Sequence, residues 1–318
     1  MSRSAANPSA AAVTAVQHGA RRGLIFAVYL AVVVAAFERP LRELLAYALG
    51  RDFCSYIPLI PFVSAYLLWA HRGAIFAHPE RSWRMGTALA VAAAAIAGWA
   101  AAAGGGMARG DRLGLLALSL VLFIFCGVAF IHGNRVFRAG LFPWLFLLLI
   151  IPFPPVLVQH SIFWLQAGST TLSDWTFRLL GVPVFRQGFD LALPGVTIQV
   201  AKECSSIRSS QALGITALVA GYLYLRSPWL RAVLVAVAIP FSVVKNAIRI
   251  VTLCLLSLHV NRGFLYGRLH HEGGFVFFLI ALVLLWPFLL WLRRRDRGVP
   301  AARGRDTVVP AAAGEVSP

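Results

Sequence analysis

The stretch "GFVFFLIALVLLWPFLLWLRRRDR" (residues 274–297) decides the fold class. It runs for nineteen residues without a charged side chain and then places four arginines within five residues. An apolar run of about 20 residues is long enough to cross the hydrocarbon core of a bilayer as a helix. Basic residues directly after such a run are typical of the cytoplasmic side. The stretch therefore predicts a transmembrane helix that ends in the cytoplasm.

The rest of the chain repeats this pattern. Its 318 residues are 59% hydrophobic and its mean hydropathy is +0.76, whereas soluble domains are about 45–50% apolar. In lipid the backbone must satisfy its hydrogen bonds within helices. We therefore expect an all-α polytopic membrane protein with about eight transmembrane helices. The predicted spans are 23–38, 55–70, 86–103, 114–131, 139–153, 204–224, 229–258 and 272–292.

The formal charge of +17, from 29 Lys and Arg against 12 Asp and Glu, would suggest a nucleic-acid partner in a soluble chain. Here the basic residues lie mostly between apolar runs, so membrane topology explains them and no nucleic-acid partner is expected. With the N-terminus in the cytoplasm, cytoplasmic segments hold sixteen basic residues and outer segments ten. The sequence thus predicts an integral protein of the cytoplasmic (inner) membrane, in contact with its lipid, with residues 1–22 and the basic, disordered 293–318 as cytoplasmic tails.

The longest stretch without a predicted span is 154–203. Its first half, "VLVQHSIFWLQAGSTTLSDWTFRLLG", has apolar residues at helical spacing and a polar face, which indicates an amphipathic helix on the membrane surface or over a cavity. Its second half, "VPVFRQGFDLALPGVTIQV", predicts a small β-hairpin. Together they are expected to form a lid on the outer face; a surface loop that only fills space is the alternative.

Three polar clusters interrupt the apolar pattern: "ECSSIR" (203–208), "KNAIR" (245–249) and "LHHEGG" (269–274). With the predicted topology, each lies at the outer end of its span. Ionisable residues inside a membrane are candidates for functional sites. We therefore expect one site at the outer face, with supporting residues Glu203, Arg208, Lys245, Asn246, His271 and Gly274.

The residue types suit acyl transfer through a thioester. A thiolate is a strong nucleophile once nearby positive charge favours it, which makes Cys204 the candidate nucleophile. A histidine exchanges protons near neutral pH, and a guanidinium stabilises an oxyanion. His270 is the candidate general base and acid, and Arg249 the oxyanion stabiliser. Chemistry alone does not choose between His270 and His271.

Structural readings of the same residues remain open. Lys245 and Arg249 are four residues apart, so two like charges share one helical face and require an anion or water. Glu203 or Glu272 could supply a purely structural ion pair. Arg208 either stabilises the thiolate form of Cys204 or extends its guanidinium group towards the membrane–water interface.

The other cysteines, Cys54, Cys126 and Cys254, are widely spaced. Cys126 and Cys254 lie in apolar runs, where a cysteine is expected to pack as a small apolar side chain. Without a CxxC or HExxH pattern, neither a metal nor another cofactor is expected.

At these motifs the chain resembles the exosortase/archaeosortase family of membrane-embedded cysteine peptidases and transpeptidases. The resemblance covers roughly residues 25–290 and is carried by the segments 52–69, 179–210 ("…AKECSSIRSS"), 245–250 ("KNAIRI") and 269–278 ("LHHEGGFVFF"). It implies one membrane-embedded domain over 23–292, catalytic roles for Cys204, Arg249 and His270, and Gly274 as the motif glycine that favours His270 over His271. The family's substrates are proteins with a C-terminal sorting signal, namely a short motif, an anchoring helix and a basic tail. Many members accompany exopolysaccharide genes, and the acceptor here is unknown.

Ser206 stands where many members have glycine, which leaves the subfamily open. Two other functions remain as alternatives: a non-enzymatic membrane subunit for exopolysaccharide transport or assembly, and a serine peptidase that uses Ser205 or Ser206.

Overall fold

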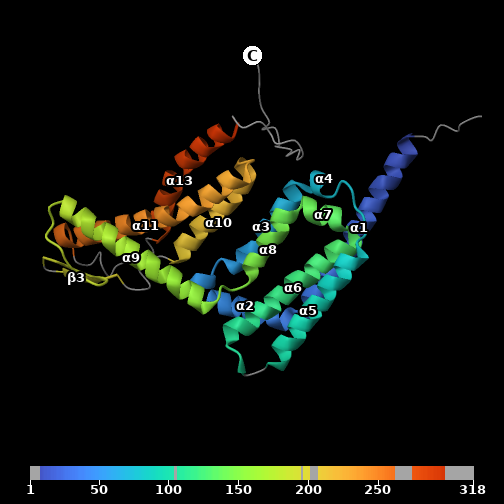
Figure 1. Cartoon of the computed structure of the whole chain (residues 1–318), viewed down its shortest axis with the longest axis horizontal. Coiled ribbons are helices and arrows are strands. Elements are labelled where there is room, and N and C mark those ends of the chain that lie inside the picture. The colour runs from blue at the N-terminus through green and yellow to red at the C-terminus, as the bar shows by residue number, and fades with distance from the viewer. Residues whose placement is uncertain (1–7, 104–105, 195, 201–206, 262–273, 298–318) are drawn as a thin grey trace, which may run out of the picture. The chain divides into compact units, whose positions relative to one another are not determined.

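The computed structural model describes residues 8–103, 106–194, 196–200, 207–261 and 274–297. They are mostly helical, with one small antiparallel sheet (Figure 1). In this part of the chain, five helices are long and apolar enough to cross a membrane: α1 (Pro8–Ala36, from Gly19), α5 (Trp83–Ala102), α6 (Arg109–Ile131), α11 (Pro228–His259) and α13 (Gly274–Arg297). A sixth span is counted if Leu141–Ile150 and α9 (Pro155–Leu179) form one broken span. The predicted helical membrane architecture with a small sheet is confirmed.

Three predicted spans coincide with helices that fall short of these criteria. The span 55–70 is a short apolar helix, Ile57–Ala70, made of a 3-10 turn and α3 (Ile60–Ala70). The span 139–153 contains only α8 (Leu141–Leu147) and a 3-10 turn. The span 204–224 contains α10 (Ile207–Tyr224), whose first turns carry arginine, two serines and glutamine and so lower its hydropathy. At the N-terminus, α1 begins at Pro8, well before the predicted residue 23.

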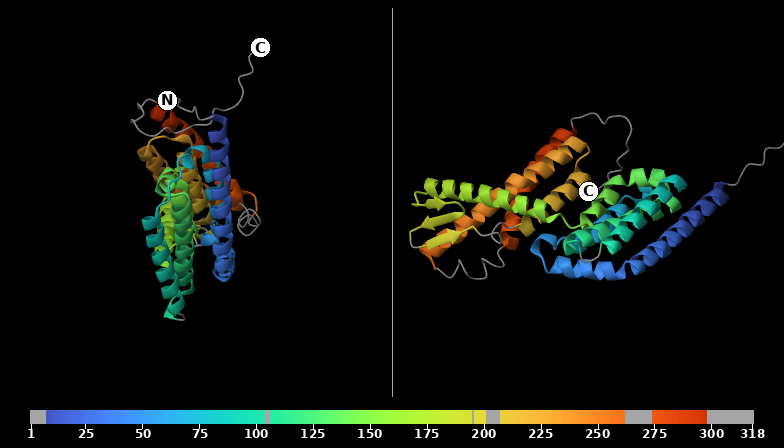
Figure 2. Two further views of the ribbon diagram at one scale, coloured as in Figure 1. Left: turned by 90° about the vertical axis from the view of Figure 1, so that its right-hand side faces the viewer. Right: turned by 60° about the horizontal axis from the view of Figure 1, so that its bottom comes forward.

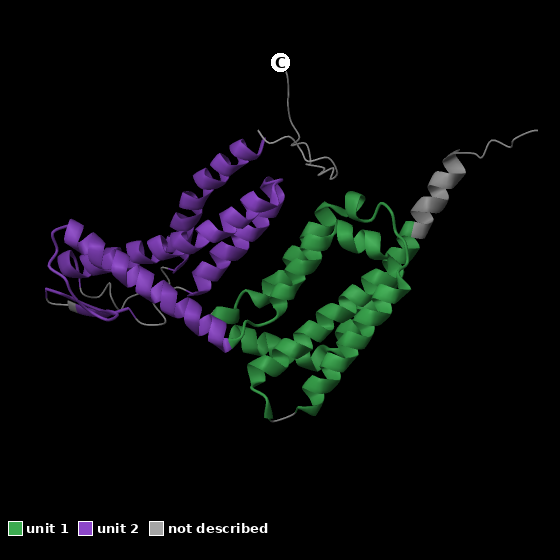
Figure 3. Ribbon diagram, in the orientation of Figure 1, with its two compact units in different colours: residues 1–154 green, residues 155–318 purple. Residues whose placement is uncertain are grey.

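The chain divides into two compact units, residues 1–154 and 155–318 (Figure 3). The remaining elements of the first unit are short: α2 (Glu38–Leu49), 3-10 turns at Asp52–Cys54 and Ile57–Leu59, α4 (Arg72–Ile75), α7 (Asn134–Ala139) and a 3-10 turn at Leu148–Ile150.

In the first unit, α1, α5 and α6 pack at close range because small residues and short polar side chains lie between them. A Cβ on Gly127 would come within 2.2 Å of the Tyr29 ring, so only glycine lets α1 approach α6 there. The Tyr29 hydroxyl donates to the Phe123 carbonyl oxygen over 2.8 Å, and the buried Ser119 hydroxyl donates to the Ala93 carbonyl oxygen over 2.8 Å. These bonds join three separate helices.

A tight turn follows α6 at Gly133, whose φ of 88° is in the left-handed region. A Cβ at this position would lie 0.9 Å from the carbonyl oxygen of Glu80. The loop before α5 is fixed to the same turn, since the Ser82 amide donates to the Ala129 carbonyl oxygen over 3.1 Å. The backbone of the two segments therefore meets at a distance that excludes any side chain.

In the second unit, α10, α11 and α13 lie side by side in every view (Figure 2). Their shared apolar core consists of Leu213, Ala217, Leu225, Leu234, Ala238, Ala281, Leu285, Leu289 and Leu292. At one end, the Arg293 guanidinium lies 5.6 Å from the centre of the Tyr224 ring, and the buried Asp296 carboxylate accepts the amide hydrogens of Arg226 and Ser227. The helices α10 and α13 therefore run parallel to each other and antiparallel to α11.

The predicted hairpin has a third strand. The strands β1 (Phe185–Gln187), β2 (Asp190–Leu193) and β3 (Val196–Gln199) form an antiparallel sheet in the order β1-β2-β3. Gly188, with a φ of 62°, allows the tight turn between β1 and β2. One face of the sheet joins an apolar cluster with the end of α9 and the second half of α11: Phe177, Leu191, Leu193, Val200, Ile250, Val251 and Cys254.

The predicted amphipathic helix is α9, and its buried face is the polar one. Most of its buried side chains are polar: Gln166, Ser169, Thr170, Ser173 and Asp174, beside Val158, Leu165 and Phe177. Large apolar side chains are exposed instead, with Trp164 at 69% and Trp175 at 62%. A helix in water shows the reverse pattern. The polar face of α9 is covered by protein, because α9 packs against α11.

Candidate functional site

The polar cluster of α11 is buried. Lys245 and Asn246 are fully buried and Arg249 is 8% exposed. The spacing of one and four residues puts the three side chains on one side of the helix. They sit in a helix that is otherwise apolar enough to span a membrane. Burial of two cations is costly, so such a cluster is retained only where structure or chemistry requires it.

A hydrogen bond joins this cluster to the first turn of α10. The Lys245 ammonium group donates to the Ser209 hydroxyl. Ser209 lies five residues after Cys204 in the sequence. The contact therefore holds the helix that begins just after the predicted nucleophile against the helix that carries Arg249.

The three helices bring the described parts of the predicted clusters to one end of the second unit. α10 and α13 begin where the second half of α11 lies, since they are antiparallel to it. At a rise of 1.5 Å per residue, Ser209 lies about 22 Å from the end of α10 at Tyr224, Arg249 about 31 Å from the start of α11 at Pro228, and Gly274 about 33 Å from Asp296 on α13. The shared depth of the three complete clusters stays a prediction, because Cys204 and His270 lie outside the described residues.

Two buried hydrogen bonds connect α9 to this end of the unit. The Asn246 side chain donates from Nδ2 to the Ser169 hydroxyl over 3.0 Å. The Gln166 side chain donates from Nε2 to the Val200 carbonyl oxygen over 2.8 Å. Gly168 permits the close approach, because a Cβ there would lie 3.1 Å from Cγ1 of Val243.

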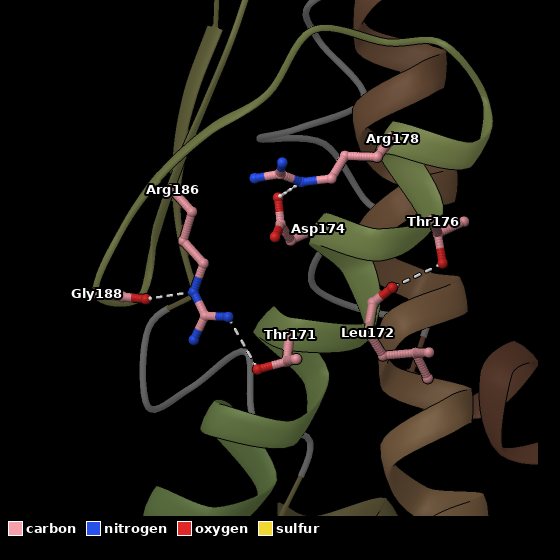
Figure 4. Close-up of polar contacts among 7 residues, drawn as sticks. All are labelled: Thr171, Leu172, Asp174, Thr176, Arg178, Arg186 and Gly188. Atoms are coloured by element: carbon pink, nitrogen blue, oxygen red, sulfur yellow. Dashed lines mark hydrogen bonds and ion pairs between the residues drawn. The ribbon is translucent and has the colours of Figure 1, made fainter.

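One arginine attaches the sheet to α9 (Figure 4). Arg186 of β1 donates to the Thr171 hydroxyl of α9 over 2.9 Å, and within the hairpin it donates to the Gly188 carbonyl oxygen over 3.0 Å. A second arginine, Arg178, forms an ion pair at 3.0 Å with the nearly buried Asp174 within α9 itself. The bond from Arg186 to Thr171 fixes the sheet relative to α9.

Four of the predicted site residues lie outside the described residues: Glu203, Cys204, His270 and His271. Of the others, the structure brings Lys245, Asn246 and Arg249 together. Arg208 is exposed on the first turn of α10, and Gly274 is the first residue of α13. The convergence of thiol, imidazole and guanidinium stays a prediction. The predicted disordered tail 293–318 is wrong for residues 293–297, which continue helix α13, and the rest of it lies outside the described residues.

The three described cysteines are buried thiols: Cys54, Cys126 and Cys254. Burial raises the pKa of the Cys54 thiol to about 11, although the nearby Arg51 opposes the shift. Such a thiol is protonated at neutral pH and reacts slowly. Within the part of the chain that the structure describes, no three His, Cys, Asp or Glu side chains come together as a metal ion would require.

Sequence reasoning missed Gln166 and Ser169, because it treated the helix in 154–203 as part of a lid, on the membrane surface or over a cavity, and assigned no partner to its polar face. The recurrence of polar residues at 166, 169, 170, 173 and 174 was the available signal. In a membrane protein a polar stripe at helical spacing indicates the face that contacts protein.

Fold and site together define a helical membrane protein with a buried basic cluster on α11 that is hydrogen-bonded to the first turn of α10. The chain belongs to the transmembrane exosortase family (Exosortase_EpsH), whose family model matches residues 49–287. Membership confirms the resemblance seen in the motifs, and the family implies substrates with sorting signals. No curated protein and no solved structure matches the chain.

Proposed function

We propose that this exosortase is a cysteine peptidase or transpeptidase that cleaves C-terminal sorting signals at the outer face of the inner membrane. The proposal also takes residues 23–292 as one membrane-embedded domain, with 154–203 covering the outer side of the site. The observation that carries it is the hydrogen bond between the buried Lys245 and Ser209, since it ties the helix of Arg249 to the chain just after Cys204.

The short segments on either side of Cys204 support the same proposal. Cys204 lies four residues after Val200 and five before Ser209, and both of these residues are held by buried side chains of the unit. Five residues span at most about 18 Å. This short tether on both sides supports a thiol at the end of the unit that holds Arg249.

The reaction proceeds in two acyl-transfer steps. His270 takes the thiol proton of Cys204, and the sulfur attacks the scissile carbonyl carbon. Arg249 stabilises the oxyanion that forms. When the carbon–nitrogen bond breaks, His270 returns the proton to the leaving amine, which leaves a thioester on Cys204. Water or an acceptor amine then gives a proton to His270, attacks the thioester and releases the thiol.

The test is cleavage of a co-expressed substrate that carries a sorting signal, with membrane insertion measured in parallel. Cys204→Ala, Arg249→Gln and His270→Gln are each expected to abolish processing while the protein still inserts. His271→Gln is the comparison for the choice of histidine and is expected to reduce processing less than His270→Gln does. If Cys204→Ser is silent and joint neutralisation of Lys245 and Arg249 is severe, the transport or assembly alternative holds instead. Processing by Cys204→Ala at the normal rate rules out thiol catalysis.

A further inference from the structure

The buried polar face of α9 requires an explanation beyond packing. Apolar side chains would fill the same space without the cost of desolvating hydroxyl and amide groups. Transmembrane helices associate through small residues and can do so without interhelical hydrogen bonds. Nevertheless, α9 presents Gln166 and Ser169, one turn apart, to its neighbours, and both form buried hydrogen bonds.

The partner of Gln166 is a backbone carbonyl group, so this contact fixes the path of the chain. The group belongs to Val200, the last residue that the structure describes before residues 201–206. Val200 itself is buried in the apolar cluster with Phe177 and Ile250. The amide of Gln166 thus adds a directional bond at the place where the chain leaves the sheet towards Cys204.

The partner of Ser169 is on α11. Asn246 is adjacent to Lys245 and precedes Arg249 by three residues, so all three share one side of the helix. A hydrogen bond from Asn246 to α9 limits rotation and sliding of α11. The direction in which Arg249 extends from the helix is fixed at the same time.

We propose that Gln166 and Ser169 are positioning residues, which hold the chain before Cys204 and the helix of Arg249 at a fixed separation. This inference rests on the proposed thiol chemistry. Because the two side chains are three residues apart on one rigid helix, α9 acts as a common support for both parts of the site. The covalent steps themselves are unchanged.

The test compares Gln166→Leu and Ser169→Ala with Ser161→Ala, whose hydroxyl bonds only to the Leu157 carbonyl oxygen of α9 itself. With purified protein and a peptide substrate in detergent, kcat is expected to fall about 10- to 100-fold in the first two variants, because displacement of a reacting group by about 1 Å has an effect of this size. KM and the amount of folded protein stay near wild type. Ser161→Ala is unchanged.

Two further measurements separate positioning from a merely structural role. The first is the pH dependence of the rate at which an alkylating reagent modifies Cys204, measured on the peptide that contains Cys204 by mass spectrometry. In Gln166→Leu, the pH at which this rate rises is expected to be higher than in wild type. In a double-mutant cycle, Ser169→Ala adds little to Asn246→Ala, because both changes remove the same bond. Ser169→Thr, which keeps the hydroxyl, restores most of kcat.

Wild-type kcat in both variants, together with an inactive Cys204→Ala, overturns the positioning role and leaves the proposed function in place. Loss of activity only in proportion to loss of folded protein overturns it as well. Cleavage by Cys204→Ala instead removes the proposed function itself, whatever the α9 variants do.

Discussion

The Asn246 side chain donates a hydrogen bond to the Ser169 hydroxyl over 3.0 Å, and both residues are fully buried. This bond joins two helices that the sequence assigns to different roles, a lid and a membrane span. It makes the predicted lid helix part of the wall of the candidate site. Several consequences for stability and activity can be measured.

Gly168→Ala is expected to weaken that bond by steric means. The added Cβ would lie 3.1 Å from Cγ1 and 3.3 Å from Cγ2 of Val243, so α9 and α11 must move apart by a few tenths of an ångström. We expect slower substrate processing and little change in membrane insertion. Gly214→Ala on α10, where a Cβ meets no described atom within 4 Å, is the matched control. Val243→Ala in the Gly168→Ala background should restore processing; if it does not, steric separation is not the cause.

Gly133→Ala is expected to be severely destabilising. Its φ is 88° and the new Cβ would overlap the Glu80 carbonyl oxygen at 0.9 Å, so the loop before α5 must move. Gly181 provides the comparison, because it also has a positive φ, 71°, but no described atom within 4 Å of its Cβ position. Gly181→Ala is therefore expected to lower the free energy of unfolding only by the backbone strain, which is about 1–2 kcal/mol. In detergent, the unfolding temperature of Gly133→Ala should be far lower than that of Gly181→Ala. Equal unfolding temperatures would refute the steric argument.

Acid should destabilise the first unit through His132. This side chain follows α6, is 6% exposed, and contacts the edges of Phe26 and Phe76. Burial, helped by the nearby Arg22, lowers its pKa from 6.5 to about 4. The unfolded state binds the proton more readily, so the stabilisation is present above pH 6.5 and is lost as the pH falls towards 4.

The free energy of unfolding is expected to fall by about 3 kcal/mol in full, because each unit of difference between the pKa values of the unfolded and folded states contributes about 1.36 kcal/mol. The check is the unfolding temperature at pH 7, 5.5 and 4.5 for wild type and His132→Phe. The variant should lose less stability between pH 6.5 and 4 than wild type. Identical slopes would show that other groups are responsible.

Asp296 is expected to stabilise the end of the second unit where α11 begins. Its buried carboxylate accepts the amide hydrogens of Arg226 and Ser227, the latter over 3.1 Å, just before α11 begins. Its loss leaves two amides without that acceptor. Hydrogen bonds to charged groups contribute about 1.5–3 kcal/mol, so Asp296→Ala should lower stability by about that amount and Asp296→Asn by less. Arg297→Ala, on the exposed neighbour, is the control, and a loss as large as that of Asp296→Ala would contradict the assignment.

The long apolar helices were predictable, because apolar length and flanking arginines are local features, although α1 begins well before the predicted residue 23. The shared depth of the polar clusters stays a prediction, because Cys204 and His270 lie outside the described residues. The third strand was not predictable, because Val196–Gln199 pairs with β2 through contacts that four residues cannot specify alone. The surroundings of α9, membrane surface or cavity, were left open by the sequence for a different reason. Its periodicity identifies a polar face, but whether water or protein covers that face depends on Gln166, Ser169 and their partners Val200 and Asn246.

The central claim is that Cys204 forms a covalent bond with the substrate at the outer face. The most direct test is to incubate the purified enzyme with a sorting-signal substrate, stop the reaction with acid to preserve thioesters, and identify the modified peptide by mass spectrometry. The account predicts an acyl adduct on Cys204 that hydroxylamine removes and that Cys204→Ala lacks. An adduct on Ser205 or Ser206, or complete cleavage by Cys204→Ala, would contradict it.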